Sequence, residues 1–475
     1  MTPGTTASMT HPATATSGID ARGVLAFLAA VEAEHTINLH SLLVARQGET
    51  VLEAYWAPYT TDDRQLLYSV SKTFTSTAMG FALAEGKLAL TDRIVDLLGD
   101  SVPADVSERA AEQTVHHVLS MSTGHDEDTF AVMLERGNHD LAATYLTIPP
   151  QQPVGSCHVY NNGASWVAGE LVRRVTGEGL MGYLRPRLFE PLGIAPTWDV
   201  DPLGRELGLS GVHATTREIS AFAELYRTGG GDVLPQGWVA QASTRHIPTR
   251  SDDNAEWTHG YGYQVWLSRE GFRADGAYGQ YALILDDLTV TITSAEAAGS
   301  QPLLDLVWMH LIPAARGAAT DPDRETASRL ASRLSALELR RPKDAGVAGP
   351  WHHAGPVSSW PSLAVGADQH HLPDLRDVTL VRDGDGWAMR FTTDGVECDL
   401  AAPSGGWHRT TLQLGDVVVP VAMAVGTLST GAARVHLAFT DSIHVLRVEL
   451  GPRGGVYAWE TSPLSYGKLS EFIAR

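Results

Sequence analysis

Ser69 and Lys72 have the residue types and spacing for nucleophilic catalysis. They lie three positions apart in a small, apolar, helix-like stretch, 68–85, and positions i and i+3 share a face of a helix. A serine attacks a carbonyl once a base takes its proton, and a lysine is such a base when burial or a neighbouring charge lowers its pKa. At a helix start the N–H of Ser69 is also unpaired and can face an oxyanion. The alternative is a capping serine beside a surface lysine, and Ser465 and Lys468 repeat the spacing.

Tyr160 and Asn162 form a second element, just before a predicted helix at 162–175. In an extended segment positions i and i+2 point the same way, so both side chains can reach one site. A tyrosine hydroxyl near an ammonium group can ionise and relay a proton, and an asparagine can hold a substrate amide and steady a lysine. The structural alternative is that Asn162 caps the helix while Tyr160 packs beneath it, and the two roles are compatible.

Gly276, Ala277 and Tyr278 form a third element, within a strand-like, glycine-containing stretch at 274–281. Small residues let a substrate backbone approach a strand edge, and one N–H there can complete an oxyanion hole. Tyr278 and nearby aromatic residues can line an apolar acyl pocket or pack in the core. A glycine-rich hairpin with no role in binding is the alternative.

The order and spacing of these segments resemble the serine β-lactamase and penicillin-binding-protein-like superfamily, especially its class C β-lactamase, esterase and D-aminopeptidase branch. Ser69-x-x-Lys72 is similar to the first family motif and Tyr160-x-Asn162 to the second. The stretches TVHHVLSMSTGH, PRLFEPLGI and GYGYQVW lie where comparable family segments lie. The resemblance covers about residues 20–315.

The resemblance implies an acyl-enzyme on Ser69. Lys72 and Tyr160 would shuttle the proton, with either of them as the resting base. The N–H groups of Ser69 and Ala277 would form the oxyanion hole, and Asn162 would hydrogen-bond the substrate and the lysine. Water or another nucleophile would then take the acyl group, with no cofactor and no metal.

The third motif departs from the family's usual Lys-Thr-Gly or His-x-Gly. The matching stretch, Ala274-Asp275-Gly276, has no basic first residue, and strand alternation would point Arg273 to the other face. In the family that cation helps to recognise a carboxylate, so the departure predicts poor or no β-lactamase activity. It favours an ester or amide substrate without an essential carboxylate.

Three functions stay open. The first is hydrolysis of an ester or amide bond in a small molecule or short peptide. The second is acyl transfer, as in penicillin-binding-protein-like thioesterases that form amides or cyclise peptides in natural-product biosynthesis. The third is a non-catalytic binding protein on the same fold, and the presence of Ser69, Lys72, Tyr160 and Asn162 together argues against it.

The elements that must position these residues follow from hydrophobic periodicity. A helix and two strands precede Ser69, helices dominate the middle, and three strands and a helix follow residue 260. This order allows one sheet built from both ends of the segment, with a helical insertion between them. The resemblance implies an α/β (α+β) domain over 20–318 whose sheet is antiparallel, with flanking helices and a helical lobe. A disordered N-terminus is expected at 1–19.

The C-terminal part has a different pattern. A linker helix is expected within 319–344. From 345 to 475, short β-type runs alternate with Gly, Asp and Ser-Gly, which predicts an all-β barrel or sandwich. Gly349-Pro350-Trp351 is faintly similar to the lipocalin Gly-x-Trp, so a lipocalin-like barrel is one form this domain could take.

Composition excludes several classes of function. The 475 residues carry a formal net charge of −20 at pH 7, so the surface repels phosphate backbones and anionic membranes, and we expect no nucleic-acid or membrane partner. The two cysteines and the histidine pairs lack disulfide or metal-site spacing. The first residues have no signal-peptide features and no apolar run is long enough to span a membrane, so we expect a cytoplasmic protein. The oligomeric state stays open.

Overall fold

The computed structural model describes residues 14–473 except 16–17, 137–139, 252–253, 298, 300, 318–323, 347–348, 361–362, 364–368, 453 and 465–466. The chain folds as two compact units. The first unit combines 1–44, 49–65 and 292–474, and the second comprises 45–48 and 66–291. All of the predicted site residues belong to the second unit. The domain boundaries expected from the sequence stay a prediction.

The second unit is built around two packed helices, α2 (Ser71–Ala84) and α8 (Asn162–Thr176). Helix α2 has small and apolar residues on every side and is buried from Ser71 to Ala82, as expected for a helix that is covered all round. Helix α8 ends at Gly177, whose left-handed φ of 75° stops the helix. The surrounding helices are α3 (Ile94–Leu98), α4 (Glu108–Glu112), α5 (Val115–Leu119), α6 (Phe130–Glu135), α7 (Leu141–Leu146), α9 (Leu180–Leu184), α11 (Thr216–Arg227) and α12 (Trp238–Ala242).

The largest sheet has the strand order β1-β3-β2-β10-β9-β8-β7. Its central strands β2 and β10 are buried along almost their whole length, and the order combines strands from both ends of 20–318, as the sequence predicts. The bounds are β1 (Thr14–Ala15), β2 (Ile37–Arg46), β3 (Glu49–Tyr55), β7 (Trp266–Leu267), β8 (Phe272–Gly276), β9 (Gln280–Ile284) and β10 (Leu288–Glu296).

The N-terminal expectation needs one correction. Thr14 and Ala15 pair with Glu53 and Leu52 in antiparallel register, so this part of the expected disordered stretch is a strand. The reason is that β3 would otherwise present an open edge whose backbone groups lack partners. The rest of that stretch, apart from residues 18 and 19, lies outside the described residues.

A small sheet of β4 (Gln65–Leu66), β6 (Val212–Ala214) and β5 (Thr197–Trp198) leads into the candidate nucleophile. The N–H of Leu67 donates to the carbonyl of Val212 at 2.8 Å. This hydrogen bond fixes the backbone two residues before Ser69.

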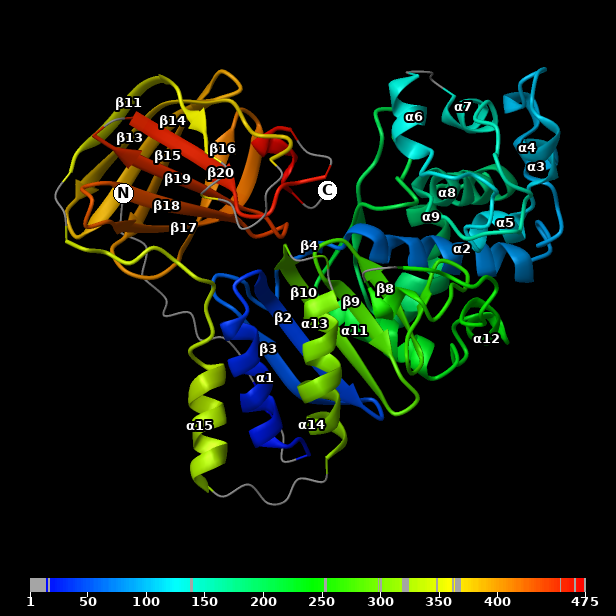
Figure 1. The fold of residues 1–475 in the computed structure, drawn as a ribbon, viewed down its shortest axis with the longest axis horizontal. Coiled ribbons are helices and arrows are strands. Elements are labelled where there is room, and N and C mark those ends of the chain that lie inside the picture. Colours follow the sequence, from blue (N-terminus) through cyan, green and yellow to red (C-terminus); the bar gives the residue numbers. More distant parts are fainter. Residues whose placement is uncertain are drawn as a thin grey trace. The chain divides into compact units, whose positions relative to one another are not determined.

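Helices in the first unit gather around α1 (Ala21–Ala33). It packs against α13 (Gln301–Leu306), α14 (Ile312–Arg316) and α15 (Arg324–Leu334), and Figure 1 shows them running side by side. Asp20 caps α1, because its carboxylate accepts from the N–H groups of Arg22 and Gly23. The expected linker helix is α15. Among the described residues, no helix has the length and apolar character that crossing a bilayer requires.

The C-terminal β-region is a sandwich-like pair of sheets, and the barrel alternative is wrong. One sheet has the order β11-β13-β14-β15 and the other β12-β20-β19-β18-β17-β16, and the described strands of the two sheets share one apolar core. The chain passes between sheets after β15 through Gly405 and Gly406, both with positive φ, and β15 and β16 belong to different sheets. The bounds are β11 (Trp351–Pro356), β12 (Ser358–Ser359), β13 (Leu375–Asp383), β14 (Gly386–Thr393), β15 (Val396–Pro403), β16 (His408–Leu414), β17 (Val417–Thr427), β18 (Ala433–Phe439), β19 (Val445–Gly451) and β20 (Gly454–Trp459).

Within the first unit, the C-terminal β-region is hydrogen-bonded to the segment that follows β3. Arg409 donates to both carboxylate oxygens of Asp63, at 2.7 and 2.6 Å, and to the carbonyl of Pro58 at 2.9 Å. The hydroxyl of Tyr59 donates to the carbonyl of Ser442 at 3.2 Å. The β-region is therefore fixed to the residues just upstream of β4.

Candidate active site

Ser69 lies in a single 3-10 turn, Tyr68–Val70, directly before α2. Tyr68 has a left-handed φ of 48°, a strained conformation for a tyrosine. Ser71 holds the turn, because its hydroxyl donates to the carbonyl of Tyr68 at 2.6 Å and accepts from the N–H of Val212 at 3.0 Å. The turn presents Ser69 at the N-terminal end of the helix that carries Lys72.

The amine of Lys72 contacts three oxygen atoms. It lies 2.8 Å from Ser69 Oγ, 2.7 Å from Asn162 Oδ1 and 2.7 Å from the carbonyl oxygen of Leu209. Lys72 is 1% exposed, and this burial lowers its pKa to about 7, against a smaller opposing effect of the Asp128 carboxylate. A large fraction of Lys72 is therefore uncharged at neutral pH and can accept a proton.

Tyr160 lies beside both Lys72 and Ser69. Its ring centroid is 5.0 Å from Lys72 Nζ, its hydroxyl hydrogen-bonds Ser69, and its ring stacks on Trp266 with centroids 5.8 Å apart. Burial raises the pKa of Tyr160 above its ordinary value, and the carboxylates of Asp275 and Asp128 raise it further. Tyr160 therefore keeps its proton at neutral pH, whereas a large fraction of Lys72 is uncharged.

Two adjacent asparagines have different roles at the start of α8: Asn161 caps the helix and Asn162 contacts Lys72. Asn161 is the N-cap, since its Oδ1 accepts from the N–H of Ala164 at 3.2 Å and from the hydroxyl of Thr129 at 2.8 Å. Asn162 is the first residue of the helix and its side chain points to Lys72. The capping role considered for Asn162 is wrong, because the preceding residue already fills it.

Asp128 joins the site, and the sequence analysis missed it. Its Oδ1 accepts from the backbone N–H of Asn162 at 2.8 Å, and its Oδ2 accepts from the side-chain Nδ2 of Asn162 at 2.6 Å. Its Oδ1 also accepts from the N–H of Phe130 at 3.1 Å, at the first residue of α6. An aspartate two residues before a short helix looks like an ordinary capping residue, so the sequence carried no signal for this contact.

The third motif lies in close contact with the turn that carries Ser69. A Cβ built on Gly276 would lie 2.4 Å from the carbonyl oxygen of Leu67 and 3.3 Å from the backbone nitrogen of Ser69. The following turn is held by Gln280, whose Nε2 donates to the carbonyls of Ala277 and Tyr278 at 3.2 and 3.3 Å. This strand end could approach Ser69 so closely only with glycine at position 276.

Tyr278 lies against Tyr68. The two tyrosine rings meet edge to face with centroids 5.4 Å apart, and Tyr278 has a left-handed φ of 65°. Two strained tyrosines therefore stand beside the candidate nucleophile, one from each segment that would form the oxyanion hole.

Arg273 does not supply the missing cation of the third motif. Its guanidinium is fully buried, with Nε donating to Asp275 at 2.8 Å and Nη1 to Ser268 Oγ at 3.0 Å. It also lies over the Trp257 ring, 4.6 Å from the centroid. Arg273 and Asp275 share one face of β8, as strand alternation requires.

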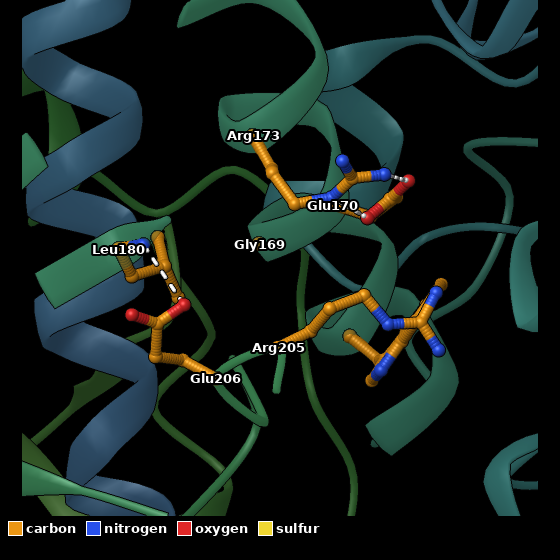
Figure 2. A pocket seen from close by; sticks show the side chains of 7 residues that line it. Gly169, Glu170, Arg173, Leu180, Arg205 and Glu206 are labelled. Atoms are coloured by element: carbon orange, nitrogen blue, oxygen red, sulfur yellow. Dashed lines mark hydrogen bonds and ion pairs between the residues drawn. The ribbon is translucent and has the colours of Figure 1, made fainter. Parts of the chain in front are cut away.

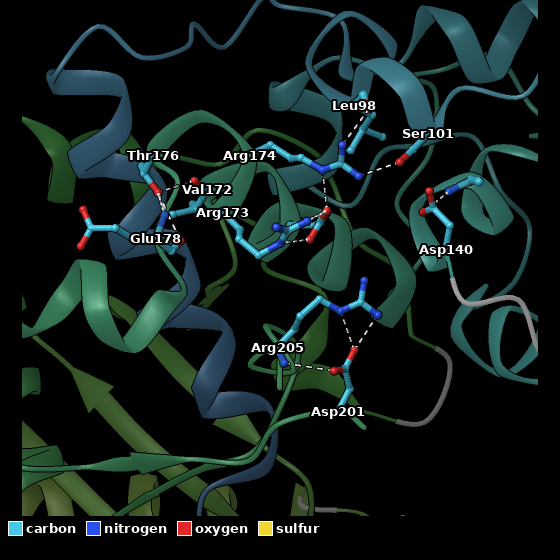
Figure 3. A network of polar contacts seen from close by, with 12 residues as sticks. Leu98, Ser101, Asp140, Val172, Arg173, Arg174, Thr176, Glu178, Asp201 and Arg205 are labelled. Carbon is cyan, nitrogen blue, oxygen red and sulfur yellow. Dashed lines mark hydrogen bonds and ion pairs between the residues drawn. The ribbon is translucent and has the colours of Figure 1, made fainter. Parts of the chain in front are cut away.

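A separate small cavity lies on the far part of α8 (Figure 2). It has a volume of about 10 Å³, room for one water, and is lined by Trp166, Gly169, Glu170, Arg173, Leu180, Arg205 and Glu206. Charged side chains there pair with one another or with backbone groups, as Figure 3 shows for Arg173, Arg174 and Arg205. We interpret this group as structural. Ser465, the repeat of the Ser-x-x-Lys spacing, lies outside the described residues.

Known proteins resemble part of this chain. The 6-aminohexanoate-dimer hydrolase of Paenarthrobacter ureafaciens is 28% identical over 42% of this chain and 55% of its own length, so the chain spans about half of that relative. Penicillin-binding protein 4 of Amycolatopsis lactamdurans is 27% identical over 46% of this chain and 68% of its own length.

Solved structures share the fold. A putative β-lactamase from Bacteroides dorei superposes with a TM-score of 0.53 at 16% identity, covering 62% of this chain and 99% of that chain. The octameric penicillin-binding protein homologue from Pyrococcus abyssi gives a TM-score of 0.50 at 14% identity, over 89% of this chain and 98% of that one. Residues 26–306, more than half of the sequence, match the family model named Beta-lactamase. The chain therefore belongs to the β-lactamase family of hydrolases and penicillin-binding-protein-like proteins.

Proposed function

We propose that the protein is a serine hydrolase that cleaves an ester or amide bond through an acyl-enzyme on Ser69. The three oxygen atoms around the Lys72 amine carry this proposal. Two of them, Asn162 Oδ1 and the Leu209 carbonyl, can only accept hydrogen bonds. A neutral amine has two N–H groups and one lone pair, so donation to those two oxygens leaves the lone pair facing Ser69 Oγ.

The reaction then proceeds in two halves. Lys72 takes the proton of Ser69 while Oγ attacks the carbonyl carbon. The protonated Lys72 returns a proton to the leaving group by way of the Tyr160 hydroxyl, whose own pKa keeps it protonated. Water then attacks the acyl carbon while the neutral Lys72 takes a proton from it, and Lys72 passes that proton to Ser69 Oγ as the bond between the acyl group and Oγ breaks. The N–H groups of Ser69 and Ala277 would hold the oxyanion in both halves.

The charges near the third motif favour a substrate without an essential carboxylate. Arg273 is bound to Asp275 and buried, so it is not available to a ligand. Asp275 adds a negative charge close enough to raise the pKa of Tyr160. We therefore expect poor or no hydrolysis of β-lactams, whose recognition in this family relies on a cation at that position. The name of the 6-aminohexanoate-dimer hydrolase supports an amide among the candidate substrates.

Intact mass after incubation with a fluorophosphonate tests the proposal. We expect one adduct on the wild-type protein, mapped to the Ser69 peptide and absent from Ser69→Ala. Ser465→Ala is the matched control, because it removes the serine of the other Ser-x-x-Lys stretch, and it should label like the wild type. An adduct that persists in Ser69→Ala, or a folded wild type that forms none, would refute the proposal.

Product analysis would then separate hydrolysis from acyl transfer. A panel of p-nitrophenyl esters, amides and β-lactams would be tested with and without added amines. Free acid as the main product in the presence of amine supports hydrolysis, and a new amide supports the acyltransferase alternative.

A further inference from the structure

The orientation of the Asn162 amide decides where the lone pair of Lys72 points. In the structure the amide oxygen faces Lys72 at 2.7 Å and the amide nitrogen faces Asp128 at 2.6 Å. A rotation of 180° would put two donors opposite each other at Lys72. The lysine would then lose one of the two acceptors that direct its lone pair to Ser69.

Asp128 fixes this orientation, because an ionised carboxylate can only accept hydrogen bonds. One of its oxygens holds the side-chain nitrogen of Asn162 and the other holds the backbone N–H of the same residue, at 2.8 Å. The two contacts clamp Asn162 at both its backbone and its side chain. Asp128 is itself anchored by the N–H of Phe130.

The neighbouring residues bring Asp128 to this place. Thr129 donates through its backbone N–H and its hydroxyl to Asn161 Oδ1, at 3.2 and 2.8 Å. A Cβ built on Gly163 would lie 2.0 Å from Thr129 Oγ1, so only glycine lets the two segments approach. The stretch before α6 and the start of α8 therefore form one rigid hydrogen-bonded unit.

We propose that Asp128 is a positioning residue that holds the Asn162 amide so that Lys72 presents its lone pair to Ser69. The inference rests on the proposed function, and it extends the site to a carboxylate that reaches Ser69 only through Asn162 and Lys72. The charged and titratable groups around Lys72 are Asp128 and Tyr160, and Asp275 acts on Tyr160.

The first test compares Asp128→Asn with Glu127→Gln, which removes a negative charge from an exposed side chain one residue away. Asparagine keeps the shape of Asp128 but places a donor opposite Asn162 Nδ2, so the Asn162 amide should turn. We expect Ser69 labelling by a fluorophosphonate to slow by about 10- to 100-fold in Asp128→Asn, the effect of a lost hydrogen bond to a charged group. Glu127→Gln should label like the wild type.

The double variant Asp128→Asn with Asn162→Asp tests the geometry directly. It exchanges the two side chains, so the new amide at position 128 would donate to the new carboxylate at position 162. That carboxylate would also accept from Lys72, and every side-chain hydrogen bond regains a partner. We expect labelling faster than in Asp128→Asn by at least about tenfold. The carboxylate would now touch Lys72, so the midpoint of the pH–rate profile should lie above that of the wild type.

A second readout does not depend on turnover. The chain has four lysines, Lys72, Lys87, Lys343 and Lys468, so lysine labelled with ¹³C at Cε gives few NMR signals, and we expect that of Lys72 to titrate at about pH 7. The midpoint of Lys72 should fall in Asp128→Asn, because a charge that raises its pKa is removed. A role in folding alone would lower the melting temperature without moving this midpoint.

The outcomes separate the two proposals. If the folded wild type is not labelled, the serine hydrolase proposal fails, and the NMR titration still decides the role of Asp128. If the wild type is labelled but Asp128→Asn labels within threefold of Glu127→Gln, or its Lys72 midpoint does not move, Asp128 is not a positioning residue. A double variant no faster than Asp128→Asn would also overturn the inference.

Discussion

Substitution of Gly276 by alanine tests the oxyanion hole without touching a side chain that carries chemistry. The φ of Gly276 is not in the left-handed region, so alanine can adopt the backbone conformation and the cost is purely steric. The added methyl would lie 2.4 Å from the carbonyl oxygen of Leu67, whereas such contacts essentially never fall below 3.0 Å. Strand β8 and the nucleophile turn must therefore separate by at least about 0.6 Å.

A separation of that size exceeds the tolerance of an oxyanion hole. Donors act at about 2.7–3.1 Å from the developing oxyanion, and loss of one donor costs about 10²–10³ in kcat, or about 3–4 kcal/mol. We expect the kcat of Gly276→Ala for a p-nitrophenyl ester to fall by about 10²-fold, with Ser69 and Lys72 intact. The fall should appear in kcat more than in KM, since the donors act on the transition state.

The matched control is Gly182→Ala, at an exposed position of α9 where the nearest atom to the new methyl is 3.9 Å away. It should leave kcat unchanged and match or exceed the wild-type melting temperature. The reasoning fails if folded Gly276→Ala keeps kcat within threefold of the wild type, because the close approach of β8 would then have no role in catalysis.

Three further predictions follow from the buried groups. Tyr160→Phe should lower kcat by about 10²- to 10⁴-fold. The acidic limb of its pH–rate profile should stay near pH 7, where Lys72 loses its proton. Loss of this limb in Tyr160→Phe would assign the base to Tyr160 instead. Burial lowers the pKa of His40 to about 3 and that of His444 to about 4. Below about pH 6.5 the unfolded chain therefore binds protons that the folded chain does not. The free energy of unfolding should fall as the pH drops from about 6.5 towards 4, by about 3 kcal/mol from His444 alone. Equal urea midpoints at pH 7 and pH 5 would contradict this. Asp63→Asn, which breaks the two-fold contact with Arg409, should cost about 1–3 kcal/mol in calorimetry, and a melting temperature equal to that of the wild type would show that the pair contributes nothing.

The candidate catalytic pair and the second motif could be predicted from the sequence because their geometry is local. Ser69 and Lys72 are three positions apart in the sequence, and Tyr160 and Asn162 are two positions apart. The strand and helix periods also predicted one sheet built from both ends of the segment and the helical middle, since burial on one face determines the residue pattern. The resemblance supplied the antiparallel pairing and the place of the third motif, and strand alternation at Arg273 predicted that this residue is not the missing cation.

What the sequence could not provide depends on which distant segments touch. Asp128 is 34 residues before Asn162, and only tertiary packing turns a capping-type aspartate into the group that orients the amide. The proposal that Lys72 and not Tyr160 is the base rests on burial, which lowers the pKa of an amine and raises that of a phenol in the same site. The barrel alternative is wrong because β15 and β16, on either side of Gly405 and Gly406, belong to different sheets. Hydrogen bonds between strands decide this pairing, and the alternation of side chains along one strand does not predict it. Local spacing thus determined which residues are candidates for the reaction. Only the folded structure shows that Lys72 is buried and that Asp128 hydrogen-bonds Asn162 beside it, because both depend on contacts between distant segments.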